Sequence, residues 1–395
     1  MSLLFISSIV PDEERFRTPA FTRSGNNVLT GIAKSIPADT KLTVLSCIPI
    51  PSYPVGKLYV SAEIVNLTES IEIHMLPVFN LKIIKNIIWA YYCKKFIRRW
   101  AKENEGEPLD VLVYNIYTPS LSSLYRVCKG VGAKLHCILY DLGVPPKRLG
   151  LPLLTMMAYK EGEKIAKKYV PLIDGRIVIN ESIVSHYAPG KDYILVDGGI
   201  NEQVINNLFP LRESKDECYT LVLAGMLWDQ NGTKLVLDMM AAHLDMNVKV
   251  YLAGKGIDVP LIEEAAKKDS RIVYTGMLTM EELFKLYEKA DILLNLRIEE
   301  EVDFHFPSKL LEYMVTGKHV ISTPVAHAER DYGEFLSILH KPTPDELAQL
   351  IEDIMSKGKK TLYEKGLQTR KFMLEKRTWE ARTKEIMEYI NNKHE

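Results

Sequence analysis

Several kinds of chemical site are missing from this sequence. The five cysteines among 395 residues are scattered, odd in number and never spaced as CxxC. This pattern argues against a disulfide framework or structural zinc and favours free thiols in a reducing compartment. The nine histidines contain no HExxH or other paired-ligand spacing, so we expect no bound metal. A P-loop and a GxSxG elbow are also missing, which leaves ATPase and hydrolase functions without support.

Long apolar runs and a strong net charge are missing as well. No stretch approaches the ~18 uninterrupted apolar residues that a transmembrane helix needs. The N-terminal segment has no basic region before its short apolar run, so 3–10 is expected as a buried strand rather than a signal peptide. The net charge is −1, which implies no bulk attraction to nucleic acid and makes any anion binding local. We expect a cytoplasmic protein, at most peripheral at the inner face of the membrane.

Short apolar segments alternate with helical patterns along the whole chain. Strands are expected at 3–10, 41–48, 110–117, 134–142, 174–180 and 193–199, and again at 219–225, 247–254, 271–276, 290–296, 318–323 and 335–340. Brief, continuously apolar strands separated by helices indicate parallel sheets covered on both faces. The predicted fold class is therefore α/β, with two doubly wound, Rossmann-like domains. We place the first at 1–198 with a returning helix at about 372–395, and the second at 199–371.

Three expected strands of the second half end in glycine, at Gly225, Gly254 and Gly276. Doubly wound sheets bind ligands beyond the carboxyl ends of their strands, and two such domains would place the site in the cleft between them. Glycine lets the backbone approach a ligand, and the helix expected after Gly232 would offer free amides to an anion. Ordinary turns between strand and helix are the alternative.

The segment "DFHFPSKLLEYMVTGKHVIS" (303–322) places a lysine where a helix dipole disfavours one. A helix is expected over 308–316, capped by Ser308, with Lys309 in its first turn. A phosphate bound there would meet helix amides and the Lys309 ammonium together. Glu312, one turn on, is suited to accept hydrogen bonds from two ribose hydroxyls. An exposed i,i+3 ion pair between Lys309 and Glu312 explains the pattern equally well.

Arg297 follows the expected strand at 290–296, on the same edge of the sheet. Its guanidinium is suited to bidentate binding of a diphosphate. The acidic run at 299–303 competes with this interpretation, because it supplies carboxylate partners close in sequence.

With these residues in view, the second half resembles the group 1 (family 4) retaining glycosyltransferases, in particular the capsular and exopolysaccharide branch. The segments that carry the resemblance are "AGMLWDQNG" (224–232), "RIVYTGMLTMEELFKLYEKADILL" (271–294) and "FPSKLLEYMVTGKHVIS" (306–322). It is specific over about 219–330 and rests on strand order elsewhere. The resemblance implies a GT-B fold whose C-terminal helix crosses back to the first domain. It also implies a UDP- or GDP-linked sugar donor, transfer with retention, and neither metal nor separate cofactor.

The resemblance also implies roles for individual residues. Lys309 and Arg297 would neutralise the leaving diphosphate, Glu312 would bind the ribose, and the turn after Gly276 would lie against the base. The implied donor-binding residues are Gly25, Asn26, Gly225, Met226, Gly254, Gly276, Met277, Leu278, Ser308, Lys309, Leu310 and Glu312.

Three positions depart from the family pattern. Many members have an arginine directly after the first glycine turn and a lysine before the second, where this chain has Met226 and Asn231. The family's paired glutamates are also incomplete, because Phe304 stands eight positions before Glu312, flanked by Asp303 and His305.

The first domain offers fewer signals. "SGNNVLTGIAKSI" (24–36) resembles the loop and helix that cradle donor and acceptor, with Gly25, Asn26 and Asn27 as candidate contacts. An ordinary helix start capped by asparagine is the alternative. Asp141 ends an expected strand where relatives carry an acidic residue facing the cleft, and it is our candidate for orienting the acceptor hydroxyl or acting as its base. A capping aspartate is the competing interpretation.

The stretch 79–105 combines aromatic and basic residues on an expected helix. Such a helix suits an anionic membrane surface and an acceptor carried on a lipid diphosphate. A helix packed in the core with a solvated basic face is the alternative.

Together these features predict a metal-independent hexosyltransferase that moves a hexose from a nucleotide-diphosphate sugar to a glycan or lipid-linked acceptor in cell-surface polysaccharide synthesis. Asp141, Arg297 and Lys309 are its catalytic candidates, and no nucleic-acid partner is expected. A catalytically weak GT-B partner subunit of an active transferase is the second possibility. A sugar-nucleotide epimerase or an inverting transferase is the third, and the FPSK segment disfavours it.

Overall fold

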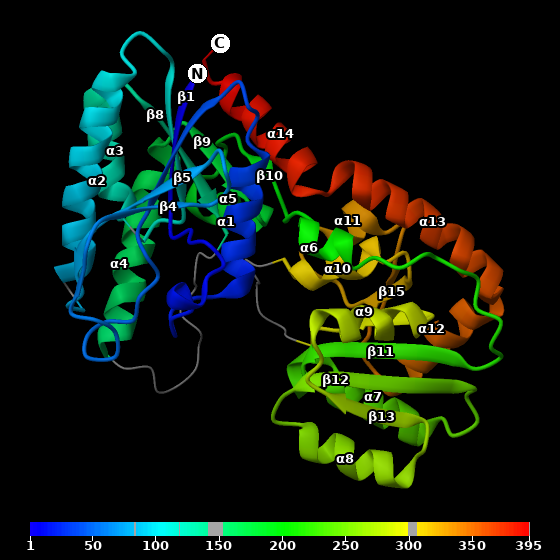
Figure 1. The fold of residues 1–395 in the computed structure, drawn as a ribbon. Coiled ribbons are helices and arrows are strands. Elements are labelled where there is room, and N and C mark those ends of the chain that lie inside the picture. Colours follow the sequence, from blue (N-terminus) through cyan, green and yellow to red (C-terminus); the bar gives the residue numbers. More distant parts are fainter. Residues whose placement is uncertain (83, 118, 141–152, 299–305, 395) are drawn as a thin grey trace. The chain divides into compact units, whose positions relative to one another are not determined.

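The chain forms two compact units, each with its own parallel sheet (Figure 1). The computed structural model describes residues 1–82, 84–117, 119–140, 153–298 and 306–394. Unit 1 comprises Met1–Gly199 with Trp379–Glu395, and unit 2 comprises Ile200–Thr378. The predicted return of the chain to the first unit begins at Trp379, because helix α13 (Gly358–Lys376) continues past the expected boundary near 372.

Unit 1 is built on eight strands in the order β10-β9-β8-β7-β1-β2-β5-β4, and all neighbours are parallel except β4 and β5. Its strands are β1 (Ser2–Ser7), β2 (Lys41–Ser46), β4 (Glu63–Asn66), β5 (Glu72–Met75), β7 (Leu109–Tyr114), β8 (Lys134–Leu139), β9 (Gly175–Val178) and β10 (Ile194–Leu195), with β3 (Tyr59–Val60) and β6 (Val78–Phe79) forming a separate pair. Because β1 pairs with β2 on one side and β7 on the other, the winding reverses at β1. Doubly wound sheets bind ligands at such a reversal.

The sequence analysis found six of these strands and missed the four between 59 and 79. Five of the six contain a buried run, β10 being the exception, whereas β3, β4, β5 and β6 span two to four residues and each includes an exposed position. Short strands of this kind lack the apolar run on which the prediction relied.

Helices cover both faces of the unit 1 sheet. They are η1 (Glu14–Phe16), α1 (Arg23–Ser35), α2 (Ile84–Glu103), α3 (Leu121–Val131), α4 (Leu153–Tyr169), η2 (Val170–Leu172), α5 (Glu181–Tyr187) and α14 (Trp379–Asn391). The indole of Trp379 is buried, and a Cβ added to Gly31 or Gly199 would collide with it. Arg382 extends this anchor by donating to the Leu195 carbonyl at 2.6 Å. Packing around the start of α14 therefore explains why the C-terminal helix belongs to unit 1.

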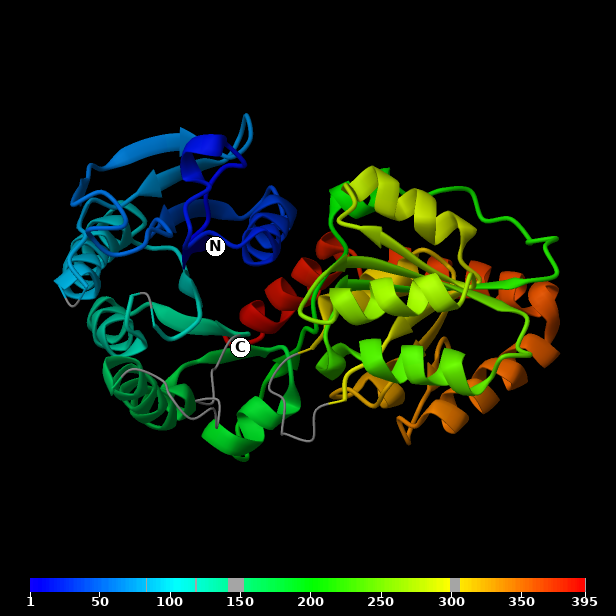
Figure 2. The same ribbon diagram turned by 90° about the horizontal axis from the view of Figure 1, so that it is seen from below.

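Unit 2 has six parallel strands in the order β13-β12-β11-β14-β15-β16, with helices on both faces (Figures 1 and 2). The strands are β11 (Tyr219–Met226), β12 (Val248–Lys255), β13 (Ile272–Gly276), β14 (Ile292–Asn295), β15 (His319–Ser322) and β16 (Ser337–Ile338). The helices are α6 (Glu202–Asn206), η3 (Asp229–Asn231), α7 (Thr233–Ala242), α8 (Val259–Lys268), α9 (Met280–Lys289), α10 (Ser308–Val315), α11 (Ala328–Tyr332), α12 (Pro344–Ser356) and α13. All six strands match predicted segments, and β11, β12, β14 and β15 have the buried apolar run typical of a covered parallel sheet.

A half-buried histidine makes unit 2 sensitive to acid. Burial lowers the pKa of His319 from 6.5 to about 4, and the ring bonds the Ser337 hydroxyl at 3.0 Å. The unfolded chain therefore binds the proton first, and stability is lost as the pH falls from 6.5 toward 4. The expected loss is about 3 kcal/mol over that interval.

Urea unfolding at several pH values, followed by tryptophan fluorescence and circular dichroism, measures this effect. His319→Gln retains a hydrogen-bonding side chain without the titration, so its unfolding free energy should decline less between pH 6.5 and 4. An identical decline in both proteins would contradict the assignment.

Candidate functional site

The carboxyl edge of the unit 2 sheet is built from glycine turns that fit closely together. Gly225, Gly254 and Gly276 have φ of +123°, +136° and +71°, a region that favours glycine. Gly225 and Gly254 are partners in the ladder of β11 and β12, and a Cβ on Gly254 would overlap the Gly225 carbonyl oxygen. The backbone conformation thus favours glycine at all three predicted strand ends, which we call the rim of the sheet.

Lys309 lies at this rim. Its side chain extends from the first turn of α10, and Nζ donates a hydrogen bond to the Ala224 carbonyl at the end of β11. A Cβ added to Gly225 would collide with the same ammonium. Burial lowers the pKa of Lys309, and the charge of Glu312 partly opposes this shift. The structure therefore places a cation between the strand end and the helix start, as the sequence analysis expected.

Glu312 lies one turn further along α10, next to two buried tyrosines. The Tyr287 hydroxyl donates to Oε1 at 3.3 Å, and the rings of Tyr287 and Tyr313 pack edge to face at 5.3 Å. Burial raises the pKa of Glu312, while Lys309 and Tyr287 act in the opposite direction. Glu312 and Lys309 are both half-buried, so the alternative of an exposed ion pair is wrong.

Two predicted contacts at the start of α10 need correction. Pro307 occupies the N-cap in an extended conformation, so Ser308 is the first helical residue and its hydroxyl caps nothing. The ring of Pro307 sets its φ at −73° and shifts the cap one residue upstream. The Leu310 side chain is fully buried in the core, so it is not available to a ligand.

The end of β14 holds Arg297 by its backbone. The Arg297 amide donates to Thr323 Oγ1 at 2.8 Å, and the Asn295 side chain donates to Ser322 Oγ at 2.9 Å. These bonds tie the turn after β14 to the turn after β15, which places Arg297 on the same edge as Lys309. The acidic run at 299–303, its expected competitor, lies outside the described residues.

Methionines stand at two of the glycine turns. Met226 and Met277 are exposed, and Leu278 is half-buried. The family pattern implies a cation at position 231, where this chain has Asn231. The Asn231 side-chain amide donates to the Met226 carbonyl at 2.9 Å. That side chain therefore stabilises the turn after β11 and leaves the rim less basic than the family pattern.

Sequence reasoning missed the aromatic residues that support the rim. Tyr313 hydrogen-bonds the Ala224 amide at 3.2 Å, and the Tyr274 hydroxyl donates to the Gly254 carbonyl at 3.0 Å. Phe306 stacks on His327 with ring centroids 4.9 Å apart. The tyrosine in "EYM" was visible in the sequence, but its partner in β11 was not.

In unit 1 the structure changes the role of one predicted contact. The amide of Asn26 in α1 bonds the backbone of Val10 in both directions, each at 3.0 Å. It therefore holds the segment after β1 and is not an N-cap, because Thr22 occupies that position. Gly25 and Asn27 are half-buried in the first turns of α1. Asp141 lies outside the described residues.

A hollow of about 310 Å³ opens where the winding of the unit 1 sheet reverses. Ser8, Cys47 and Tyr114 contribute to its lining from the ends of β1, β2 and β7, and Lys85 and Trp89 line it from α2. Lys85 Nζ donates to the Ile50 carbonyl at 3.1 Å, and burial lowers its pKa. No motif in the sequence pointed to this hollow, because its lining comes from segments far apart in the chain.

No group of three or more histidine, cysteine, aspartate or glutamate side chains could hold a metal ion in the part of the chain that the structure describes.

Comparison with known proteins defines the fold. Residues 218–357 match the family described as "Glycosyl transferases group 1", and no curated protein matches the chain in sequence. A sucrose-phosphate synthase from Thermosynechococcus elongatus is similar over 99% of each chain, with a TM-score of 0.65 and 13% identity. Anabaena HepE in complex with UDP is similar over 99% of this chain and 100% of its own, with a TM-score of 0.63 and 12% identity.

A glycosyltransferase from Rickettsia africae gives a TM-score of 0.65 at 13% identity, over 100% of this chain and 98% of its own. Identities this low establish the fold alone. The chain has the predicted GT-B fold, with two Rossmann-like α/β halves.

Proposed function

We propose that this chain is a retaining glycosyltransferase that moves a hexose from a nucleotide-diphosphate sugar to a glycan or lipid-linked acceptor in cell-surface polysaccharide synthesis. The observation that carries the proposal is the position of the Lys309 ammonium, at the end of β11, beside Gly225 and at the start of α10. The match of residues 218–357 to group 1 glycosyl transferases supports it, because that match covers all of these elements.

The chemistry proposed for this rim is electrostatic. The Lys309 ammonium has three N–H groups that can donate hydrogen bonds, and one of them donates to the Ala224 carbonyl. The other ammonium hydrogens, the amides at the start of α10 and the guanidinium of Arg297 would stabilise charge as it develops on the leaving diphosphate. An acceptor hydroxyl would then attack from the face that the diphosphate leaves, without metal or separate cofactor.

The rest of the donor would lie along the same edge. Glu312 accepts one hydrogen bond from Tyr287 and has capacity for further donors, which suits the ribose hydroxyls. Met277 and Leu278, after the turn at Gly276, offer an apolar surface to the base. The unit 1 hollow beside Lys85 and Trp89 is our candidate for the acceptor.

A nucleotide screen tests the donor site. We expect UDP or GDP to raise the melting temperature of the whole chain, with ADP and TDP giving smaller shifts. Ligand at 100 times its Kd stabilises a folded protein by about 2.7 kcal/mol, enough to detect. Lys309→Met should remove most of the shift. A chain that no nucleotide stabilises would contradict the proposed activity.

A catalytically weak partner subunit is the second candidate. Asn231 and Met226 favour it, since the positions where a cation was expected hold a turn-stabilising amide and an exposed thioether. Steady hydrolysis of a donor by the isolated chain distinguishes an enzyme from such a subunit. Nucleotide binding without any turnover would favour the subunit.

A further inference from the structure

Exposed apolar side chains concentrate in one part of unit 1. Among the described residues, ten of the twenty large hydrophobic side chains that are exposed lie within 53–91. The other ten are scattered over the rest of the chain. Isolated exposed hydrophobic residues are normal, but a contiguous group marks an interaction surface.

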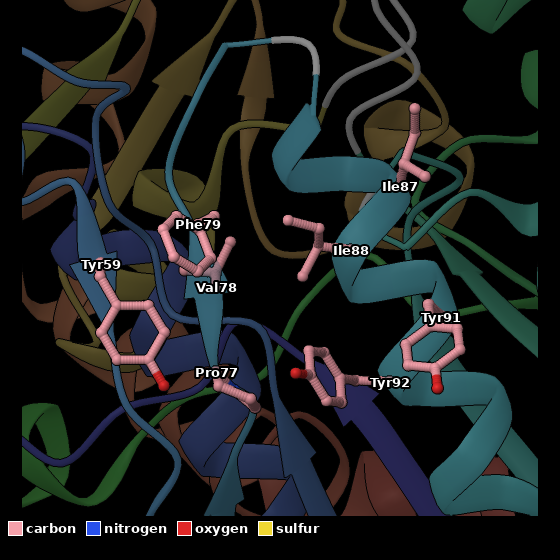
Figure 3. Close-up of a pocket in the computed structure, with 8 residues that line it drawn as sticks. All are labelled: Tyr59, Pro77, Val78, Phe79, Ile87, Ile88, Tyr91 and Tyr92. Carbon is pink, nitrogen blue, oxygen red and sulfur yellow. The ribbon is translucent and has the colours of Figure 1, made fainter.

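Four of these ten residues line a groove of about 540 Å³ between the β3–β6 pair and α2 (Figure 3). Its walls are formed chiefly by Tyr59, Phe79, Ile87, Ile88, Tyr91 and Tyr92, which we call the apolar patch. Figure 3 shows Ile88 and Tyr92 pointing from the helix toward β6. The rings of Tyr59 and Phe79 pack 5.1 Å apart on the opposite wall. The patch thus combines an apolar floor with tyrosine hydroxyls.

Helix α2 presents different chemistry along its length. Its inner stripe, including Trp89 and Trp100, is buried in unit 1. The two tryptophans that made this helix suggestive of a membrane in sequence are therefore core residues. On the outer face, Ile87 and Tyr91 are 66% and 62% exposed. One turn further on, the exposed residues become basic, beginning with Lys95.

The basic part of this face has almost no acidic counterpart. The helix carries six lysines and arginines and a single acid, Glu103. Glu103 lies 3.6 Å from Arg99. Lys95 and Arg98 are exposed and form no ion pair with any residue that the structure describes. An apolar surface followed by unneutralised cations is complementary to a lipid leaflet with anionic headgroups.

We propose that the apolar patch docks on the surface of an anionic lipid bilayer. Ile87 and Tyr91 enter the boundary between headgroups and acyl chains, and Lys95 and Arg98 bind the lipid phosphates. No helix in the described residues is long and apolar enough to cross a membrane. A second copy of the chain fits this surface less well, since its own α2 face is also basic.

The position of the apolar patch also indicates the class of acceptor, and this inference rests on the proposed function. Ile88 and Tyr92 line the apolar groove, whereas Lys85 and Trp89 of the same helix line the hollow assigned to the acceptor. A sugar acceptor attached to a membrane lipid would reach that hollow from the docked surface. The acceptor class that follows is a lipid-linked saccharide or lipid phosphate.

Vesicle flotation of the full chain tests the docking. The probes are vesicles of phosphatidylcholine alone and vesicles of an equal mixture with phosphatidylglycerol. We expect binding to the anionic vesicles, weakened by salt, and little binding to the neutral ones. The double variant Ile87→Glu, Tyr91→Glu should bind at least ten-fold more weakly, since two apolar side chains no longer leave water. Lys95→Glu with Arg98→Glu should weaken binding about five-fold or more for each cation removed.

Matched controls come from unit 2. Leu244 and Ile257 are 74% and 78% exposed, and Lys267 and Lys268 are exposed on α8. Two double variants should float with anionic vesicles as the wild type does: Leu244→Glu with Ile257→Glu, and Lys267→Glu with Lys268→Glu. Circular dichroism and unfolding confirm that each variant is folded. Equal losses in the patch and control variants would overturn the proposal.

Two further outcomes separate the docking from the proposed function. If the wild-type chain binds a nucleotide but no anionic vesicle, the docking proposal is wrong and the proposed donor site is unaffected. If the chain binds vesicles but no nucleotide, the docking proposal is supported and the proposal of a lipid-linked acceptor is wrong. Sedimentation that shows a dimer lost in Ile87→Glu, Tyr91→Glu would overturn the bilayer assignment in favour of an interface between copies.

Discussion

Lys309→Met should reduce the rate of glycosyl transfer, or of sugar-donor hydrolysis, by about 100-fold or more. Loss of one preorganised hydrogen-bond donor to a developing anion has an effect of this size. The loss is expected in kcat more than in KM, because the diphosphate gains charge only as the bond breaks. Folding should change little, because the burial that lowers the pKa of Lys309 disfavours its charge in the folded state.

Lys318 provides a matched control for this measurement. It is also half-buried, and its ammonium donates to a backbone carbonyl, that of Glu288, at 2.8 Å. It precedes β15, however, and therefore stands at the amino edge of the sheet, away from the proposed site. Lys318→Met should retain turnover. If both variants lose activity equally, or if Lys309→Met retains it, the role given to Lys309 is wrong.

Gly254→Ala should destabilise unit 2 by about 3 kcal/mol or more, because two costs act together. Its φ of +136° is one that other residues rarely adopt, and the new Cβ would overlap the backbone oxygen of Gly225. A backbone oxygen in a parallel ladder cannot move aside as a flexible side chain does. Displacement of this turn should also weaken nucleotide binding.

Gly276→Ala isolates the conformational part of that cost. Gly276 has φ of +71°, but a Cβ there meets nothing within 4 Å. We expect a loss of about 1 kcal/mol for the left-handed backbone alone. Urea unfolding of both variants, followed by tryptophan fluorescence and circular dichroism, makes the comparison. Equal losses would show that the close approach of β11 and β12 contributes nothing.

The sequence was sufficient for the α/β class, for the six strands of unit 2 and for the strand-end glycines. These features depend on local properties: an apolar run identifies a covered parallel strand, and a backbone with positive φ favours glycine over residues with a Cβ. The position of Lys309 in the first turn of a helix could also be read locally. Its helix cap was misassigned by one residue, because Pro307 and Ser308 are both acceptable at a helix start.

Only the tertiary structure decided which polar atoms remain available to a ligand. Asn26 was predicted to contact the nucleotide-sugar donor, but its side-chain amide hydrogen-bonds the backbone of Val10, sixteen residues away. Lys309 acquires its place from the Ala224 carbonyl, 85 residues earlier in the chain. The tertiary fold likewise buried Trp89 and left Tyr91 exposed on the same helix. Such outcomes depend on contacts between distant segments, which no local pattern records, whereas periodicity and backbone conformation are set by neighbours along the chain.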